Sequence, residues 1–246
     1  MAICEIRFSS RQLGMPSRML VLTPPGKGPF ATLYMLHGYG DDYTSWTRHT
    51  SLERYAARGP IMIVTAQLGK SYGVNEPGPL GVPWENYLVR DVVSFVDENF
   101  RTAVDPACRG IAGNSMGGYA ALMLTLRHPD LFGACCSLSG AAYFTHSLHP
   151  KGESFQDDLA AALPKGEYDC FAQAEKLAKS GAARPKVRLE CGDKDFLLPC
   201  NRQLHEHMNQ LGFEHEYLEY EGGHNWQLWE ARLPEMLEYF RGNLRT

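Results

Sequence analysis

A serine lies between glycines in the run Gly113-Asn114-Ser115-Met116-Gly117-Gly118. The apolar segment before it, residues 108–112, is typical of a buried strand, and the alanine-rich segment 116–127 is typical of a helix. Such a tight turn from strand to helix forces the serine into a strained backbone conformation. It also needs small residues two positions to either side, so that strand and helix can approach. The run therefore predicts a nucleophile elbow with Ser115 as the nucleophile.

Short apolar segments alternate with helical patterns on both sides of this run. Residues 3–9 and 19–23 are expected to pair as antiparallel strands at one edge of a sheet, with the turn near residues 14–17. This alternation predicts an α/β fold: a mostly parallel sheet with helices on both faces, in one domain over residues 1–246. The further expected strands are residues 32–36, 61–64, 134–138, 187–190 and 215–218, and the further expected helices are residues 52–58, 87–99, 172–179, 202–211 and 228–241.

One long segment, residues 141–168, does not follow this alternation. It is rich in glycine, proline, histidine and acidic residues and lies between two expected core strands. Long connections of this kind often act as lids over active sites. We therefore expect a small cap insertion here.

The composition is that of an ordinary globular protein: of 246 residues, 44% are hydrophobic and 21% are charged. The formal net charge of −4 includes no run of like charges, which argues against nucleic acid or an anionic membrane surface as a partner. No segment reaches the ~20 apolar residues of a membrane span, and the first residues lack the apolar region of a secretory signal. We therefore expect a cytoplasmic protein whose seven cysteines are reduced thiols.

A serine nucleophile needs a base, and the base needs a third group to orient it. In the α/β-hydrolase architecture the serine, the carboxylate and the histidine follow in that chain order, each after a strand. His224 follows the strand that ends near residue 220, and Asp193 and Asp195 follow the strand 187–191. We prefer Asp195, because the apolar residues after it could bury the carboxylate. Asp193 remains the alternative for the orienting carboxylate; its other interpretation is a residue that forms the turn.

The run His37-Gly38-Tyr39-Gly40 follows the expected strand 32–36, where hydrolases of this architecture hold a second oxyanion donor. Its glycines would let the backbone come close to the substrate. We predict an oxyanion hole formed by the backbone N–H groups of Tyr39 and Met116.

Several aromatic residues are candidates to line an apolar substrate pocket, with ordinary core packing as the alternative. Glu85, which precedes an expected helix, is a candidate for burial near the site. His205 and His207 lie two apart on an expected helix and point roughly 200° away from each other, so we expect no metal site. The aromatic candidates are Trp46, Trp84, Tyr143, Phe144 and Trp226.

Four blocks of the chain resemble the esterase D and tributyrin esterase group of α/β-hydrolases, and the resemblance spans nearly the whole chain. The group also includes S-formylglutathione hydrolases, feruloyl and acetyl-xylan esterases, and the antigen 85 mycolyltransferases. The layout is most similar to the small tributyrin-esterase-like enzymes, from which the chain departs at residues 39–42 and 141–168. The blocks are His37-Gly38, residues 113–118, residues 191–197 and residues 223–229.

The resemblance implies Ser115, Asp195 and His224 as the catalytic triad, with Tyr39 and Met116 at the oxyanion positions. It implies a serine carboxylesterase that needs no cofactor and hydrolyses short-chain acyl esters through an acyl-enzyme. The alternatives are a feruloyl or acetyl-xylan esterase, an S-formylglutathione hydrolase, an acyltransferase or a peptidase with the same residues, and an inactive binding module on a hydrolase scaffold. The expected partner is a small ester, and a homo-oligomer is left open.

Overall fold

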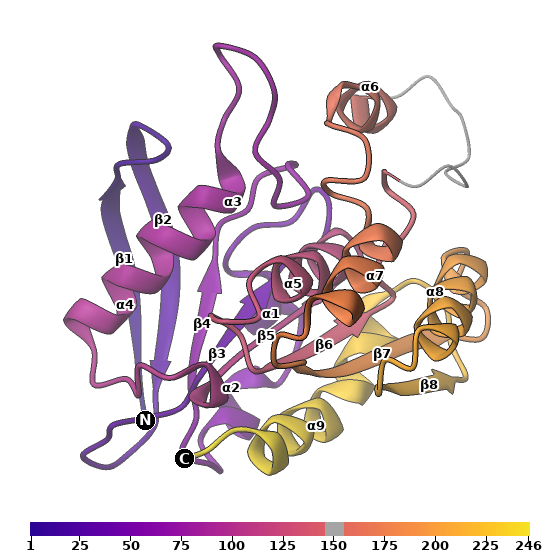
Figure 1. Ribbon diagram of the computed structural model, residues 1–246. Helices are drawn as coiled ribbons and strands as arrows, with labels where there is room; N and C mark the ends of the chain where they lie inside the picture. Colours follow the sequence, from indigo (N-terminus) through magenta and orange to yellow (C-terminus); the bar gives the residue numbers. More distant parts are fainter. Residues whose placement is uncertain (146–154) are drawn as a thin grey trace.

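The computed structural model describes residues 1–145 and 155–246 (Figure 1). The described residues form one eight-stranded sheet in the order β1-β2-β4-β3-β5-β6-β7-β8. β2 runs antiparallel to both β1 and β4, and all other neighbours are parallel. The strands are β1 (Ala2–Ser10), β2 (Met15–Thr23), β3 (Thr32–Leu36), β4 (Met62–Ala66), β5 (Arg109–Asn114), β6 (Ala134–Leu138), β7 (Lys186–Gly192) and β8 (Glu216–Tyr220).

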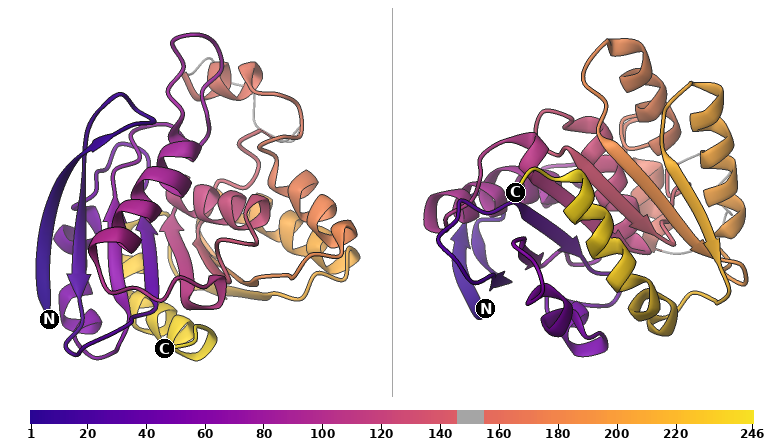
Figure 2. Two further views of the ribbon diagram at one scale, coloured as in Figure 1. Left: turned by 60° about the vertical axis from the view of Figure 1, so that its left-hand side comes forward. Right: turned by 90° about the horizontal axis from the view of Figure 1, so that it is seen from below.

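Helices cover both faces of this sheet (Figure 2). Side chains of the central strands alternate between the two faces, as the two-residue period of a strand requires: Leu33 and Met35 pack with α1, α2 and α9, whereas Tyr34 and Leu36 pack with α4, α5, α7 and α8. The helices are α1 (Ser45–His49), α2 (Leu52–Ala56), α3 (Trp84–Asn86), α4 (Val93–Asn99), α5 (Met116–Arg127), α6 (Phe155–Ala162), α7 (Cys170–Ser180), α8 (Leu198–Gln210) and α9 (Trp226–Asn243), with a π-helix η1 (Tyr87–Val92) and a 3-10 helix η2 (Pro106–Cys108).

The hairpin between β1 and β2 turns earlier than the sequence suggested. The expected turn lay near residues 14–17, but β2 begins at Met15 and the turn occupies residues 11–14. Gly14 supplies the positive φ that the turn needs, and the carboxylate of Asp91 accepts a hydrogen bond from the Gln12 N–H at 2.8 Å. A contact between residues so far apart in the chain leaves no local signal.

Part of the expected cap insertion, residues 146–154, lies outside the described residues. The described ends of the insertion meet at Tyr168, whose carbonyl oxygen accepts hydrogen bonds from the hydroxyls of Tyr119 and Thr145. Residues 155–162 form α6, a helix that was not expected. A cap function for the insertion stays a prediction.

All seven cysteines are free thiols, and all but Cys4 are buried. Within the described parts of the chain, none of the helices combines the length and the apolar character needed to cross a membrane.

Backbone contacts at the end of β5 depend on two glycines. A Cβ atom on Gly113 would lie 2.4 Å from the carbonyl carbon of Gly117, and one on Gly117 would lie 2.4 Å from the carbonyl oxygen of Leu36. Neither position has room for a side chain, because the obstacle in each case is backbone. These glycines therefore let α5 begin directly against the ends of β3 and β5.

We expect Gly117→Ala to lower the free energy of unfolding by about 3 kcal/mol, because the added methyl must push two backbones apart. Gly242→Ala is the matched control: this glycine also lies in a helix, but nothing lies within 4 Å of its would-be Cβ. The control should be neutral or stabilising by up to about 1 kcal/mol. Urea unfolding followed by circular dichroism measures both, and equal stabilities would contradict the close approach.

Candidate active site

Ser115 lies at the turn between β5 and α5 with φ 55° and ψ −117°. A residue with a side chain rarely adopts such angles, so its neighbours must hold this conformation in place. Its own N–H donates to the carbonyl oxygen of Leu138 at 2.9 Å. The serine thus occupies the strained turn that the glycine-flanked run predicts.

His224 and Asp195 approach this serine from the loops after β8 and β7. His224 Nε2 lies 2.9 Å from Ser115 Oγ, and His224 Nδ1 lies 2.9 Å from Asp195 Oδ2 and 3.1 Å from Oδ1. The structure therefore brings together the three side chains that chain order selected. With Nδ1–H donating to the carboxylate, Nε2 presents its lone pair to the serine hydroxyl.

The two candidate aspartates differ sharply in their surroundings. Asp193 is exposed, and its Oδ1 accepts a hydrogen bond from the Gly222 N–H at 3.0 Å. Asp195 is only 4% exposed and also accepts from the Leu197 N–H at 2.8 Å. Asp195, not Asp193, contacts the imidazole.

Burial by itself raises the pKa of Asp195, but hydrogen bonds from His224, the Leu197 N–H and the Ser139 hydroxyl outweigh it. The pKa of this carboxyl therefore lies below its usual value, and Asp195 is an anion at neutral pH. A buried anion beside Nδ1 holds the imidazole in one orientation and one tautomer.

Ser139 and Trp229 complete this arrangement, and sequence reasoning assigned neither of them a role. Ser139 is buried just after β6 with a positive φ of 48°, and its Oγ accepts a hydrogen bond from the Trp229 indole N–H at 3.3 Å. The Trp229 ring also packs edge-on against His224, with centroids 5.1 Å apart. The sequence carried no distinctive signal for Ser139, whereas Trp229, five residues after His224, lies in the block 223–229 that resembles the family.

Phe196 lies beside the imidazole with its ring centroid 4.6 Å from that of His224. The sequence suggested that the apolar residues after Asp195 would bury the carboxylate. Leu197 and Leu198 are buried, but Phe196 is 68% exposed. An exposed aromatic ring at this position is available to contact a substrate.

The backbone groups proposed for the oxyanion hole belong to the serine turn and to the loop beside it, since a Cβ atom on Gly117 would lie 2.6 Å from the His37 carbonyl oxygen. Met116 is the first residue of α5, so its N–H has no acceptor within the helix. The loop that holds Tyr39 is fixed by buried His37, whose Nδ1–H donates to the Gly38 carbonyl at 2.8 Å while Nε2 accepts from the Leu68 N–H at 3.0 Å. Burial lowers the pKa of His37, which keeps it neutral and able to accept.

A family model described as "Putative esterase" matches residues 10–240 of the chain. The chain belongs to this esterase family.

The curated relatives of this esterase include the acetyl esterase of Caldicellulosiruptor saccharolyticus. It is 25% identical in an alignment that covers 97% of this chain and 98% of that protein. An endo-1,4-beta-xylanase/feruloyl esterase of Xylanibacter ruminicola is 26% identical over 96% of this chain, which spans only 31% of that longer protein. These relatives agree with the group that the sequence blocks resemble.

Solved structures similar to this esterase include fluorophosphonate-binding serine hydrolase F of Staphylococcus aureus, with a TM-score of 0.89, 23% identity, and coverage of 97% of this chain and 98% of that one. The S-formylglutathione hydrolase of the same organism gives a TM-score of 0.85 at 22% identity, covering 98% and 99% of the two chains. At these identities the likeness shows the fold, and the predicted α/β-hydrolase fold is confirmed.

Three of the predicted pocket aromatics of this esterase are buried. Trp46, only 1% exposed, donates its indole N–H to the Leu36 carbonyl at 3.0 Å from the α1 side of the sheet. Trp84 packs edge-on against Tyr87, also in the core. Core packing, the alternative considered from the sequence, describes both residues.

Phe144 is likewise buried, stacked on Tyr72 with centroids 3.7 Å apart. Its neighbour Tyr143 is half-buried. Trp226 is also half-buried and stacks on His49 at 4.8 Å. Tyr143 and Trp226 are therefore the predicted aromatics that retain surface for a ligand.

The histidines considered for a metal site turn to different partners. His205 Nδ1 lies 2.8 Å from His215 Nε2, whereas His207 Nε2 donates to the Phe171 carbonyl at 3.1 Å. Over residues 1–145 and 155–246, no group of three or more histidine, cysteine, aspartate or glutamate side chains is arranged to hold a metal ion.

Glu85 is buried, but it lies at the other end of α5 from Ser115. Its carboxylate accepts hydrogen bonds from Arg127 at 2.8 Å, His128 at 2.7 Å and the Tyr168 hydroxyl at 2.8 Å. Burial by itself raises the pKa of Glu85, but the hydrogen bonds from these donors outweigh burial. The pKa of Glu85 therefore falls from its usual 4.5 to about 2. Glu85 thus anchors the base of the insertion rather than contributing to the site.

We expect Glu85→Gln to lower the free energy of unfolding at pH 7 by about 3 kcal/mol, because Arg127 loses its buried counter-ion. The folded pKa lies below the unfolded value of 4.5, so the stabilisation by Glu85 is present above pH 4.5 and disappears as the pH falls toward 2. The difference between wild type and variant should therefore shrink over that range.

Glu167→Gln is the matched control, since Glu167 contacts the same arginine at 3.4 Å but its side chain is 41% exposed. We expect it to cost less than about 1 kcal/mol. Urea unfolding from pH 7 to pH 3 measures all three proteins. A pH-independent difference for Glu85→Gln would show that the carboxylate charge does not stabilise the fold.

Proposed function

We propose that the chain is a serine carboxylesterase that hydrolyses short-chain acyl esters. The observation that carries this proposal is the continuous hydrogen-bonded line from Ser115 through His224 to Asp195 at 2.9 Å per contact. Membership of the esterase family supports the reaction class. The match to an acetyl esterase over 98% of that protein's length supports a short acyl group.

In the acylation step, His224 Nε2 takes the proton of the Ser115 hydroxyl as Oγ attacks the ester carbonyl carbon. The carbonyl oxygen becomes an oxyanion that accepts hydrogen bonds from the N–H groups of Tyr39 and Met116. Asp195 stabilises the imidazolium without taking its proton. Collapse of the tetrahedral intermediate breaks the carbon–oxygen bond of the ester, and the imidazolium returns its proton to the departing alcohol.

In the deacylation step, a water molecule takes the place of the alcohol. His224 removes one proton from this water as its oxygen attacks the carbonyl carbon of the acyl-enzyme, and the same N–H groups bind the second oxyanion. Cleavage of the bond to Ser115 Oγ releases the carboxylic acid, and the serine recovers its proton from the imidazolium. The cycle uses side chains, backbone and water and needs no cofactor.

The side chains open to a ligand bear on the choice of ester. Phe196 is exposed beside His224, and Tyr143 and Trp226 are half-buried. Aromatic surface would also suit a hydroxycinnamoyl group, and one relative is named a feruloyl esterase, so that substrate is the second candidate. An S-formylglutathione thioester is the third, based on a solved structure of that name.

Two further proposals concern the setting of the reaction. The free thiols suit a reducing compartment, which supports a cytoplasmic location. The proposed partner is a small-molecule ester, because the charge distribution offers no basic surface for nucleic acid.

A series of p-nitrophenyl esters from acetate to decanoate, together with methyl ferulate, tests the proposed substrate. We expect the highest kcat/KM between acetate and butyrate, and a loss of roughly 10⁴-fold or more in Ser115→Ala. Preference for methyl ferulate would select the feruloyl esterase. Equal rates for wild type and variant would instead point to a binding module, and a product mixture dominated by alcoholysis would point to an acyltransferase.

Two neighbouring aspartates allow a matched test of the orienting carboxylate. We expect Asp195→Asn to reduce kcat about 10³- to 10⁴-fold, because an amide no longer favours the tautomer that leaves Nε2 free to accept a proton. Asp193→Asn should retain a rate close to wild type, since Asp193 only accepts a hydrogen bond from the Gly222 N–H. Initial rates on p-nitrophenyl acetate measure both variants, and similar losses would refute the assignment of Asp195.

A further inference from the structure

The outer edge of β1 is unusually long and poorly protected. β1 has nine residues and ends the sheet, and within the described parts of the chain no strand pairs with its outer side. Natural proteins protect such edges with charged side chains, especially lysine, with proline, with bulges or by keeping the strand short. β1 contains no lysine, proline or glycine and exposes Ile3, and its two charged residues, Glu5 and Arg7, are of opposite sign. The edge therefore has free backbone donors and acceptors for another strand.

The charges on this strand are self-complementary. Glu5 and Arg7 flank Ile6, and both are exposed on the same side of the strand, since they are two residues apart. An antiparallel partner of the same sequence, centred on Ile6, places Glu5 of each copy directly opposite Arg7 of the other. Opposite charges in this position attract, whereas like charges repel.

Arg7 has no counter-ion among residues 1–145 and 155–246. Its direct neighbour across the β1–β2 pair is Arg18, a like charge. No ion pair of Arg7 is found among the described residues. A carboxylate arriving from outside the sheet would offset this repulsion. Within the chain, Glu5 accepts a hydrogen bond through Oε1 from the Tyr43 hydroxyl at 2.6 Å and attracts Arg18 rather than Arg7.

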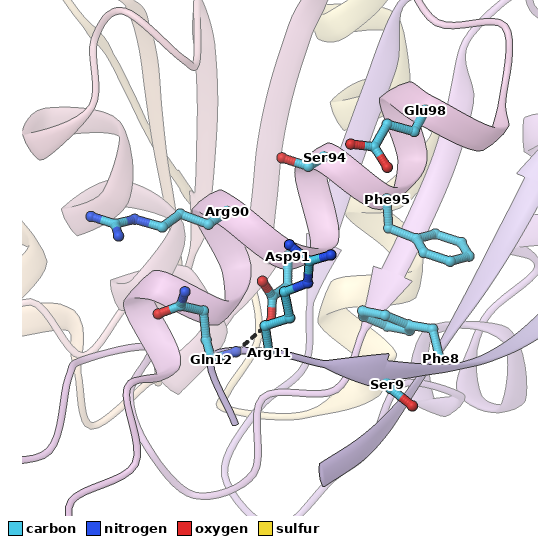
Figure 3. Close-up of a pocket in the computed structure, with 9 residues that line it drawn as sticks. All are labelled: Phe8, Ser9, Arg11, Gln12, Arg90, Asp91, Ser94, Phe95 and Glu98. Carbon is cyan, nitrogen blue, oxygen red and sulfur yellow. Dashed lines mark hydrogen bonds between the residues drawn. The ribbon is translucent and has the colours of Figure 1, made fainter. Parts of the chain in front are cut away.

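The space beside this edge is open to a second strand. A groove of ≈ 420 Å³ runs between the end of β1 and α4, with Phe8 and Phe95 facing each other at 4.8 Å (Figure 3). In the pairing centred on Ile6, Cys4 of a second copy lies opposite Phe8. The amino-terminal half of the second β1 would therefore pass along the mouth of this groove.

We propose that β1 pairs antiparallel with β1 of a second copy about a two-fold axis at Ile6. The two sheets join into one continuous sheet across a symmetric dimer, with two Glu5–Arg7 contacts between copies. The half-buried side chains of Cys4 and Ile6 gain cover in this pairing. The inference is independent of the esterase reaction, because β1 is separated from β5 by three strands.

A charge swap tests this pairing. Sedimentation velocity over a range of protein concentrations should give at least a dimer for the wild type. Glu5→Arg and Arg7→Glu each place like charges opposite one another at both Glu5–Arg7 contacts of the dimer. Each single variant should therefore halve the sedimenting mass or raise the dissociation constant of the dimer about 100-fold. The double variant Glu5→Arg/Arg7→Glu restores opposite charges and should restore the wild-type mass.

Glu214→Arg, a reversal at an exposed position on the far side of the sheet, is the matched control and should leave the mass unchanged. Thermal unfolding of each variant shows whether a change in mass reflects lost folding. A monomeric wild type, a dimer that survives both single reversals, or a double variant that remains dissociated would each overturn the proposal.

Discussion

The contact on which the site depends is the direct approach of backbones where β3, β5 and α5 meet. Gly113 and Gly117 allow this approach, because a Cβ atom at either position would lie 2.4 Å from another backbone atom. The approach has three consequences at once. It holds Ser115 in its strained conformation, it starts α5 with Met116 at the same turn, and it brings the loop with Tyr39 alongside. The serine and the backbone groups proposed for the oxyanion hole thus depend on the same packing.

The remaining groups reach the serine because parallel strands place all their carboxyl ends at one edge of the sheet. In this geometry Asp195 is a buried anion. Burying a carboxylate charge costs free energy unless hydrogen-bond donors surround it. Leu197 and Ser139 supply those donors beside His224. Trp229 bonds to Ser139 and packs on the imidazole, so the support of the carboxylate and that of the base are coupled. Aligning the triad therefore takes a second layer of side chains from β6 and α9.

The sequence predicted best those features that follow from local pattern and chain order. The bounds of β3, β6 and α5 agree with expectation, because continuous apolar runs bounded by turns mark buried elements. His224 and Asp195 were found because each follows a strand. Features that depend on distant contacts were not predictable: Trp46 is buried because it donates to a β3 carbonyl, and Glu85 lies far from the site because it pairs with the last turn of α5. Ser139 was missed because a lone serine at a strand end has no distinctive signal.

The insertion at 141–168 reaches from the nucleophile to the far end of α5. Ser115 and the backbone groups proposed for the oxyanion hole lie at the turns around Gly113 and Gly117. The insertion at 141–168 begins beside the nucleophile, where the Ala141 N–H donates to the Ser115 carbonyl oxygen at 3.3 Å. Its other end is anchored elsewhere: the Tyr168 carbonyl accepts hydrogen bonds from Tyr119 and Thr145, and the Tyr168 hydroxyl donates to Glu85. Because Glu85 is bound to the last turn of α5 and Ser115 begins the same helix, the anchor and the nucleophile lie about 18 Å apart along twelve residues. A change at the Tyr168 anchor would therefore lie far from the nucleophile, whereas a change at Ala141 would act directly on the turn that holds Ser115.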